Sequence, residues 1–166
     1  MEKIRNNVFE TNSSSTHVLC LPTEYQSYNK LDHVDFKYGE FGWEIDVYRD
    51  TESKASYLYT LLNYFESSRE EYLETIKKYL DEEGITYSFE ESSESYYWEK
   101  GYIDHGEDGE EMIETILDNK NNFLKFLFDS RAYVSTSNDN EWDEDNVYWI
   151  PSDTDEENSI FIYKGN

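Results

Sequence analysis

The sequence predicts an α+β fold, with a mainly antiparallel sheet and three to four helices packed on it in a single domain. Its 166 residues are a length that one hydrophobic core usually serves. Runs of alternating apolar residues, typical of strands, are interspersed with segments that carry apolar residues at helical spacing. Aromatic residues make up 17% of the chain, and their large side chains provide a core and argue against disorder.

The first part of the chain has strand patterns. Two short strands, at 8–9 and 17–21, are predicted on either side of a hydroxyl-rich loop over 11–16, and Pro22 ends the second strand. Apolar residues alternate with polar ones from 34 to 48, which favours a hairpin with one buried face. A sheet therefore begins before any helix.

Helical spacing follows the first strands. Apolar residues three and four apart over 51–67 predict one helix. A second helix is expected after Ser68, which has the pattern of a capping box with Glu71, and Gly84 is suited to its C-terminal end. We therefore expect a pair of helices here.

The second half of the chain returns to strands and then to helices. Alternation between 85 and 103 predicts a second hairpin. The remaining elements are expected to be two helices and three closing strands, over 110–117, 121–128, 131–137, 147–150 and 160–163.

The charge restricts the classes of partner. A formal net charge of −24, from 38 acidic and 14 basic residues, argues against direct binding to DNA or RNA, which depends on Lys and Arg. The same charge attracts a basic protein partner, most strongly at low salt. No glycine-rich phosphate loop or dinucleotide fingerprint occurs, and no cofactor is predicted.

Cysteine usage and hydropathy indicate the compartment. Cys20, the only cysteine, lies in an apolar run and is expected to be a buried, unreactive thiol. No signal-peptide core is visible, and no apolar run approaches the ~20 residues that span a bilayer. We therefore expect a cytoplasmic protein without membrane contact.

The segment from Glu10 to His17 gathers five hydroxyls, an amide, a carboxylate and an imidazole. A hydroxyl nucleophile requires a base within hydrogen-bond reach, and Ser15 with His17 is the nearest such pair. The alternative, which we favour, is a turn whose side chains bond to the nearby backbone.

Two further polar segments could take part in a site. Asp104 and His105 precede several carboxylates, a set that suits a weak Mg²⁺ or Ca²⁺ site. We favour instead a loop before an acidic helix start, because carboxylates stabilise the positive end of a helix dipole. The polar cluster over 135–140 forms the end of a predicted strand and could meet the first cluster across the sheet.

Carboxylates recur at three- and four-residue spacing on the predicted helices. Such side chains lie about 5–6 Å apart, which is comparable with the ~3.4 Å rise per phosphate along a nucleic-acid strand. A solvated acidic surface without a specific use is an equally open interpretation. The carboxylates predicted to form a binding surface are Glu70, Glu74, Glu107, Asp108, Glu110, Glu111, Glu114, Asp143, Glu144 and Asp145.

The residues Asn7-Val8-Phe9-Glu10-Thr11-Asn12-Ser13-Ser14-Ser15-Thr16-His17, preceded by Arg5, resemble the N-terminal signature of a group of uncharacterised proteins from bacteriophages and low-GC Gram-positive bacteria. The segments 101–105 and 137–140 are similar to recurring parts of that group. The group usually has a serine after the histidine, where this chain has Val18. The resemblance implies a phage or mobile-element origin. In size and charge the chain is also similar to anti-restriction and anti-CRISPR proteins, which present carboxylates where phosphates would lie.

Functions from different classes follow from these observations. The leading hypothesis is a phage-encoded acidic inhibitor, not an enzyme, that binds a basic nucleic-acid-binding host defence protein by nucleic-acid mimicry. The alternatives are an enzyme with a polar pocket and a phage accessory or structural protein, and the sequence also allows a homodimer. The residues of the alternative catalytic pocket are Glu10, Ser15, His17, Asp104, His105 and Asp139.

Overall fold

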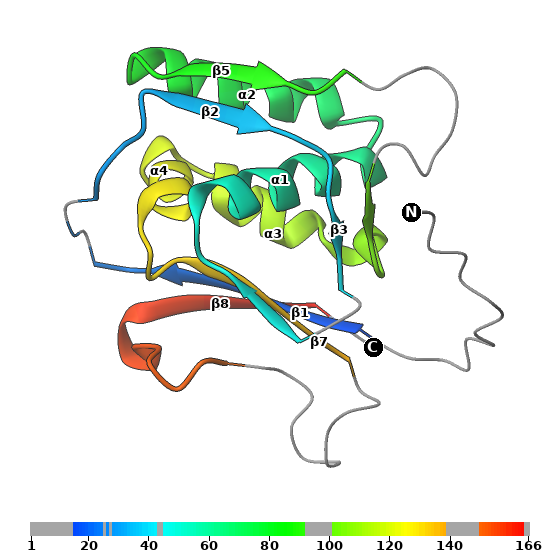
Figure 1. The fold of residues 1–166 in the computed structure, drawn as a ribbon, viewed down its shortest axis with the longest axis vertical. Helices are drawn as coiled ribbons and strands as arrows, with labels where there is room; N and C mark the ends of the chain where they lie inside the picture. The colour runs from blue at the N-terminus through cyan, green and yellow to red at the C-terminus, as the bar shows by residue number, and fades with distance from the viewer. Residues whose placement is uncertain are drawn as a thin grey trace, which may run out of the picture.

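The computed structural model describes residues 15–24, 26, 28–42, 45–91, 101–138 and 150–164. Within these residues the chain has the predicted α+β fold (Figure 1). Its strands are β1 (Ser15–Pro22), β2 (His33–Phe36), β3 (Glu40–Phe41), β4 (Asp46–Tyr48), β5 (Thr86–Phe89), β6 (Tyr102–Ile103), β7 (Tyr133–Asn138) and β8 (Ser159–Lys164). Its helices are α1 (Thr51–Leu61), α2 (Arg69–Glu82), α3 (Glu110–Leu117) and α4 (Lys120–Phe128), with short 3-10 turns η1 (Leu62–Tyr64), η3 (Gly106–Asp108) and η5 (Glu156–Asn158).

The elements form layers. A four-stranded antiparallel sheet, in the order β4-β7-β1-β8, lies along one side, and α1, α3 and α4 cover one of its faces (Figure 1). The β2–β5 pair and α2 lie on the other side of these helices. Most apolar side chains between the layers are buried. None of the helices in the described ranges is long and apolar enough to cross a membrane.

The central strand β1 is buried along its whole length. Leu19 and Leu21 face the helices and belong to the main core, whereas Val18 and Cys20 point to the opposite face of the sheet. Cys20 is a free, buried thiol, as predicted, and burial raises its pKa. His17 shares the inner face with the two leucines because side chains two apart on a strand point the same way.

The hairpin predicted over 34–48 is wrong, and the one predicted over 85–103, whose residues 92–100 lie outside the described ranges, does not form among the described residues. The segment over 34–48 contains three strands that pair with distant partners rather than with one another: β2 runs parallel to β5, β3 runs parallel to β6, and β4 joins the main sheet beside β7. The segment over 85–103 supplies β5 and β6 to the same two parallel pairs. Alternation identifies a half-buried strand, but it does not identify the strand that pairs with it.

The helices match the predictions more closely, with one difference at a cap. Helix α1 begins after Asp50, whose side chain accepts a hydrogen bond from the backbone N of Ser53 at 2.8 Å. Helix α2 begins after Ser68, but the Ser68 side chain makes no capping bond, so the predicted capping box is wrong. Gly84, with a φ of 69°, follows the end of α2 as expected.

The predicted N-terminal loop is partly strand, since β1 already begins at Ser15. Residues 11–14 of that loop, the strand predicted at 8–9, and residues 147–149 lie outside the described ranges. The predicted closing strands at 131–137 and 160–163 correspond to β7 and β8.

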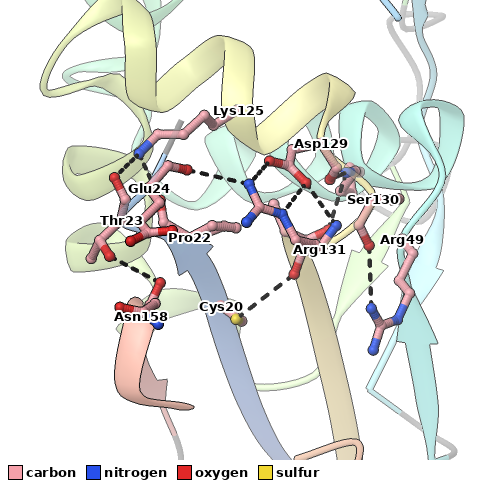
Figure 2. Close-up of polar contacts among 12 residues, drawn as sticks. Cys20, Pro22, Thr23, Glu24, Arg49, Lys125, Asp129, Ser130, Arg131 and Asn158 are labelled. Carbon is pink, nitrogen blue, oxygen red and sulfur yellow. Dashed lines mark hydrogen bonds and ion pairs between the residues drawn. The ribbon is translucent and has the colours of Figure 1, made fainter. Parts of the chain in front are cut away.

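Buried lysines connect the layers. Lys54 is 0% exposed, and its Nζ donates to the main-chain carbonyls of Asp129, at 2.8 Å, and Ala132, at 3.1 Å. Burial lowers the pKa of Lys54 to about 7. Lys125 is 3% exposed and donates to the carbonyl of Pro22 at 2.6 Å (Figure 2). The amino groups of both lysines are therefore held by backbone carbonyls inside the protein.

Candidate functional site

A set of polar side chains meets at the inner face of the sheet. Ser15 and His17, only 1% and 0% exposed, lie on β1 facing the helices. Tyr57 reaches them from α1, Lys164 from β8, and Asp104 from the turn after β6. We call Ser15, His17, Tyr57, Lys164 and the main-chain carbonyl of Asp104 the buried polar cluster.

Hydrogen bonds connect this cluster continuously. The Ser15 Oγ lies 3.2 Å from His17 Nε2 and 3.3 Å from the carbonyl oxygen of Asp104. On the other side of the imidazole, Nδ1 lies 2.9 Å from Tyr57 Oη. Lys164 Nζ donates to the Asp104 carbonyl at 3.2 Å. The cluster therefore joins α1, β1 and β8 to the turn before α3.

The protons of this network have two self-consistent arrangements. In the first, Tyr57 donates to Nδ1 of His17, Nε2–H donates to Ser15, and Ser15 donates to the Asp104 carbonyl. In the second, Nδ1–H of His17 donates to Tyr57, Ser15 donates to Nε2 and no longer to the Asp104 carbonyl, and Tyr57 donates to the sulfur of Met112, which lies 3.8 Å away. A carbonyl oxygen is a much better acceptor than a thioether. We therefore infer the first arrangement, in which His17 does not act as a base toward Ser15.

The electrostatics of the cluster also oppose a protonated imidazole. Burial, followed by the nearby charge of Lys164, lowers the pKa of His17 from 6.5 to about 3. Burial likewise lowers the pKa of Lys164 to about 8, although the carboxylates of Glu107 and Asp108 raise it in part. His17 is thus neutral at physiological pH, and accepting a proton there is costly.

One glycine packs tightly against the cluster. Gly42 has a φ of 100°, and a Cβ at this position would lie 2.9 Å from the Cβ of Asp104 and 3.1 Å from His17 Nε2. There is no space for even a methyl group on this side of the imidazole, so a substrate cannot approach it from there.

The structure brings together part of the predicted catalytic set. Ser15, His17, Asp104 and His105 come close, and the charge of His105 is among the causes that lower the pKa of His17. However, Asp104 meets Ser15 through its backbone, while its carboxylate accepts a bond from Tyr102 Oη at 2.9 Å. Glu10 and Asp139 lie outside the described ranges.

His105 occupies a strained turn rather than a pocket wall. Its φ of 55° and ψ of 36° are left-handed, and its Nδ1 lies 3.8 Å from the Glu107 carboxylate. The segment leads through η3 into α3, as the predicted loop before an acidic helix requires. Across the described parts of the chain, no three His, Cys, Asp or Glu side chains group as metal ligands.

The third predicted cluster does meet the first. β1 and β7 are antiparallel neighbours in which Ser15 lies opposite Asn138 and Thr16 lies opposite Ser137. The hydroxyls of Thr16 and Ser137 are hydrogen-bonded on the outer face of the sheet, away from His17. This contact joins two hydroxyl-rich strand ends and is separate from the buried polar cluster.

Two members of the buried polar cluster were not predicted. Tyr57 precedes Leu61 by four positions and so shares its stripe on α1, a spacing that could have identified it. Lys164 continues the alternation of Ile160 and Ile162, which places it on the inner face of β8. Its position in an apolar pattern was therefore the available signal for burial.

A second candidate site is acidic and exposed. From 101 to 119 the sequence contains no Lys or Arg. On the neighbouring α2, Lys77 forms ion pairs with Glu74 at 2.6 Å and Glu70 at 3.9 Å, so part of the predicted charge there is compensated. We call the following exposed carboxylates the acidic face: Glu70, Glu71, Glu74, Glu107, Asp108, Glu110, Glu111 and Glu114.

The two helices that carry the acidic face lie next to each other. Helix α2 packs against α3, and Tyr72 of α2 lies close enough to Glu110 and Glu114 of α3 for their charges to raise its pKa, after the larger effect of burial. The half-buried ring of Tyr72 thus lies among carboxylates from both helices. Asp143, Glu144 and Asp145, also predicted for this surface, lie outside the described ranges.

Fold and sites together define an α+β protein with a buried polar cluster and an acidic helix surface that is only partly compensated by ion pairs. No family model, curated protein or solved structure matches the chain.

Proposed function

We propose that this chain is an acidic binding protein of phage origin that acts in the host cytoplasm and inhibits a basic nucleic-acid-binding defence protein. Its carboxylates would occupy positions that phosphates take in the partner's groove. Restriction enzymes and CRISPR effectors are the partner classes with such grooves. The observation that carries the proposal is the acidic face, and above all its part on η3 and α3.

The charge on α3 is available to a partner. Glu110, Glu111 and Glu114 are exposed, and no Lys or Arg of the described residues forms an ion pair with them. Such charges interact at long range and steer a basic partner toward the surface. The ion pairs of Lys77 on α2 make that helix the weaker half of the acidic face.

The carboxylates of α3 are also presented on a rigid support. The opposite side of this helix is fully packed, with Met112, Ile113, Ile116 and Leu117 all at most 7% exposed. Lys164 holds the preceding turn through the Asp104 carbonyl. A rigid array loses less entropy on binding than a flexible acidic tail does, so more of its electrostatic attraction appears as affinity.

The test is inhibition of DNA cleavage by purified restriction endonucleases and CRISPR effector complexes, measured against the concentration of this chain. The triple variant Glu110→Gln, Glu111→Gln, Glu114→Gln removes three charges from α3. Exposed ion pairs contribute about 0.2–1 kcal/mol each, so the loss of three should weaken inhibition by about 3-fold to 100-fold. Inhibition by the unaltered chain should also weaken as salt is raised.

The control is a second triple variant that has the same net charge as the α3 variant. Three exposed carboxylates elsewhere on the chain are changed to Gln, at Glu24, Glu52 and Glu91. Equal inhibition by the two triple variants would show that only net charge matters and would contradict a specific acidic face. Absence of inhibition in both partner classes would contradict the proposal as a whole.

An enzyme is the second candidate, because Ser15, His17 and the 104–105 turn come together as that alternative requires. Tight packing, the lowered pKa of His17 and the inferred proton arrangement all argue against it. A Ser15→Ala variant that abolishes the biological effect while remaining folded would favour the enzyme. An unchanged effect would leave the acidic binding protein as the better account.

A further inference from the structure

The turn between β6 and α3 combines a strained backbone with support from three distant parts of the chain. We propose that this turn, over 104–108, is a latch that side chains from η1, β1 and β8 hold closed, and that the closed latch fixes the position of Glu107 and Asp108. The use of these two carboxylates in binding rests on the proposed function, whereas the latch itself does not.

His105 gives the latch its strain. With a φ of 55° and a ψ of 36°, it is the only non-glycine residue with a positive φ among those that the structure describes. This left-handed conformation is strained for a residue with a side chain, because the Cβ comes close to the following carbonyl oxygen. Such a conformation persists only where the surrounding structure holds it, and strained residues of this kind gather at functional sites. The contacts around the turn are therefore expected to work against this strain.

Tyr64, the last residue of η1, provides the first of these contacts. Its hydroxyl donates to the main-chain carbonyl of Ile103 at 2.8 Å and accepts from the main-chain N–H of the same residue at 3.0 Å. Ile103 is 0% exposed, so loss of the phenol would leave two buried polar groups without these partners. Burial raises the pKa of Tyr64, and the charge of Glu107 adds to this effect, so the hydroxyl keeps the proton that it donates.

Two further side chains hold the next residue of the backbone. Ser15 and Lys164 both donate to the carbonyl of Asp104, at 3.3 Å and 3.2 Å. They come from β1 and β8, they are 1% and 4% exposed, and they lie 89 and 60 positions from Asp104 in the sequence. The latch is therefore closed only when the main sheet, η1 and the turn are assembled together.

Two glycines let the turn approach the rest of the fold closely. Gly106 follows His105 directly, and a Cβ there would overlap the ring of Tyr64. At Gly109, where the turn joins α3, a Cβ would lie 2.6 Å from Cδ1 of Leu61. Close-packed contacts of this kind have few alternative arrangements, so the turn is either seated against η1 and α1 or released from them.

The latch carries part of the acidic face. Burial lowers the pKa of Lys164 to about 8, and the carboxylates of Glu107 and Asp108 partly offset this effect, so both lie near the buried amine. Helix α3 begins at Glu110, directly after the turn. Release of the turn would therefore change the spacing between these carboxylates and those of α3 without changing any charge. Tyr64 is in this sense a positioning residue for the acidic face.

Hydrogen exchange measured by NMR tests the latch in the full chain. The reporter is the amide of Gly109, which donates to the carbonyl of Gly106 at 3.1 Å, and the reference is the amide of Phe123 in α4. Tyr64→Phe keeps the ring but loses both hydrogen bonds, so the Gly109 amide should exchange about tenfold faster or more, with the Phe123 amide unchanged. The backbone chemical shifts over 107–108 should change in the same variant. Equal acceleration of both amides would mean that the chain opens as a whole, which would overturn the latch.

Tyr79→Phe is the matched control. The hydroxyl of Tyr79 donates to the carbonyl of Leu117 at 3.2 Å, at the far end of α3. The control therefore loses a phenol hydrogen bond to the same helix region without altering the turn. We expect its Gly109 amide to exchange at the rate of the unaltered chain, and an acceleration equal to that of Tyr64→Phe would contradict the latch.

A pair of variants at His105 tests the strain. His105→Gly and His105→Val both lose the imidazole, but only valine has a branched Cβ, which the left-handed conformation disfavours most. We expect the Gly109 amide to exchange about tenfold faster in His105→Val than in His105→Gly. Equal rates would mean that the turn holds no strain at this position, and the latch would be overturned.

Inhibition of the target shows whether the latch serves the acidic face. Tyr64→Phe changes no charge, yet it should weaken inhibition about threefold or more relative to Tyr79→Phe, because its carboxylates are less ordered before binding. If hydrogen exchange responds as expected but the two variants inhibit equally, the latch does not position the acidic face and that part of the proposal is overturned. If the unaltered chain inhibits neither partner class while exchange responds as expected, the latch stands and the proposed function fails.

Discussion

Acid should destabilise this protein through one buried imidazole. His17 is 0% exposed, and burial together with the charge of Lys164 lowers its pKa from 6.5 to about 3. In the unfolded chain the imidazole returns to its ordinary pKa. Below pH 6.5 the unfolded state therefore takes up a proton that the folded state does not accept until the pH approaches 3, and stability falls as the pH falls through this window.

The size of the effect follows from the width of the window. Each pH unit in it costs about 1.4 kcal/mol for one proton, so a fall from pH 6.5 to about 4.5 should cost about 3 kcal/mol. Domains of this size have a total free energy of unfolding of about 5–15 kcal/mol. A single side chain can therefore remove a large fraction of the stability at mildly acidic pH.

The measurement is urea unfolding at several pH values for the unaltered chain and for His17→Gln. The variant should be the less stable protein near neutral pH, because it alters a buried hydrogen-bonded side chain. This difference should shrink by about 3 kcal/mol between pH ~7.5 and ~4.5, because Gln has no proton to accept. Comparing two chains also removes the shared titration of the many carboxylates.

Tyr57→Phe separates the proton from the hydrogen bond. This variant loses the bond to Nδ1 of His17 but keeps the imidazole buried, so its stability should fall by a similar amount at every pH. Parallel pH profiles for the unaltered chain and His17→Gln would refute the reasoning, because they would mean that His17 titrates alike in the folded and unfolded states.

Three further substitutions test the packing and charge around the cluster. Gly42→Ala should cost more stability than Gly84→Ala in thermal unfolding: both have positive φ, which costs about 1–2 kcal/mol for alanine, but only Gly42 meets close neighbours. A smaller loss for Gly42→Ala would contradict the close packing. Lys164→Met should raise the pKa of His17, measured from its imidazole NMR signals, because a repelling charge is removed; an unchanged pKa would mean that the charge of Lys164 is not among its causes. Leu58→Ala, at a fully buried position, should cost about 2–5 kcal/mol in urea unfolding, and a loss below ~1 kcal/mol would place Leu58 outside the core.

Local patterns predicted the elements of this fold well and their partners poorly. Helices at 110–117 and 120–128 appear almost as their apolar spacing indicates, because that spacing is created by the helix itself. The pairing of β2 with β5 depends on how α1 and α2 place these strands, which no run of adjacent residues encodes. Proximity in sequence therefore suggested hairpins where the fold has parallel pairs.

In the candidate site, too, the contacts between residues close in sequence were predicted and the contacts between distant residues were not. Ser15 and His17 were identified as a pair because they are close in sequence, and the structure places both on one face of β1. The contact between Ser15 and Asp104 joins positions 89 apart, and the sequence marked both as polar without showing that they meet. The sequence also could not show that Asp104 contributes its carbonyl rather than its carboxylate, since that depends on the left-handed turn at His105.

The buried lysines determine how the chain behaves toward amine-reactive reagents. Lys54, Lys125 and Lys164 are 0%, 3% and 4% exposed, whereas the side chain of Lys37 is 55% exposed. Acylating dyes and amine-coupled surfaces should therefore attach only through outward lysines such as Lys37 while the chain is folded. Unfolding would add three reactive amines, so the mass gained in a brief labelling pulse would count the unfolded molecules directly.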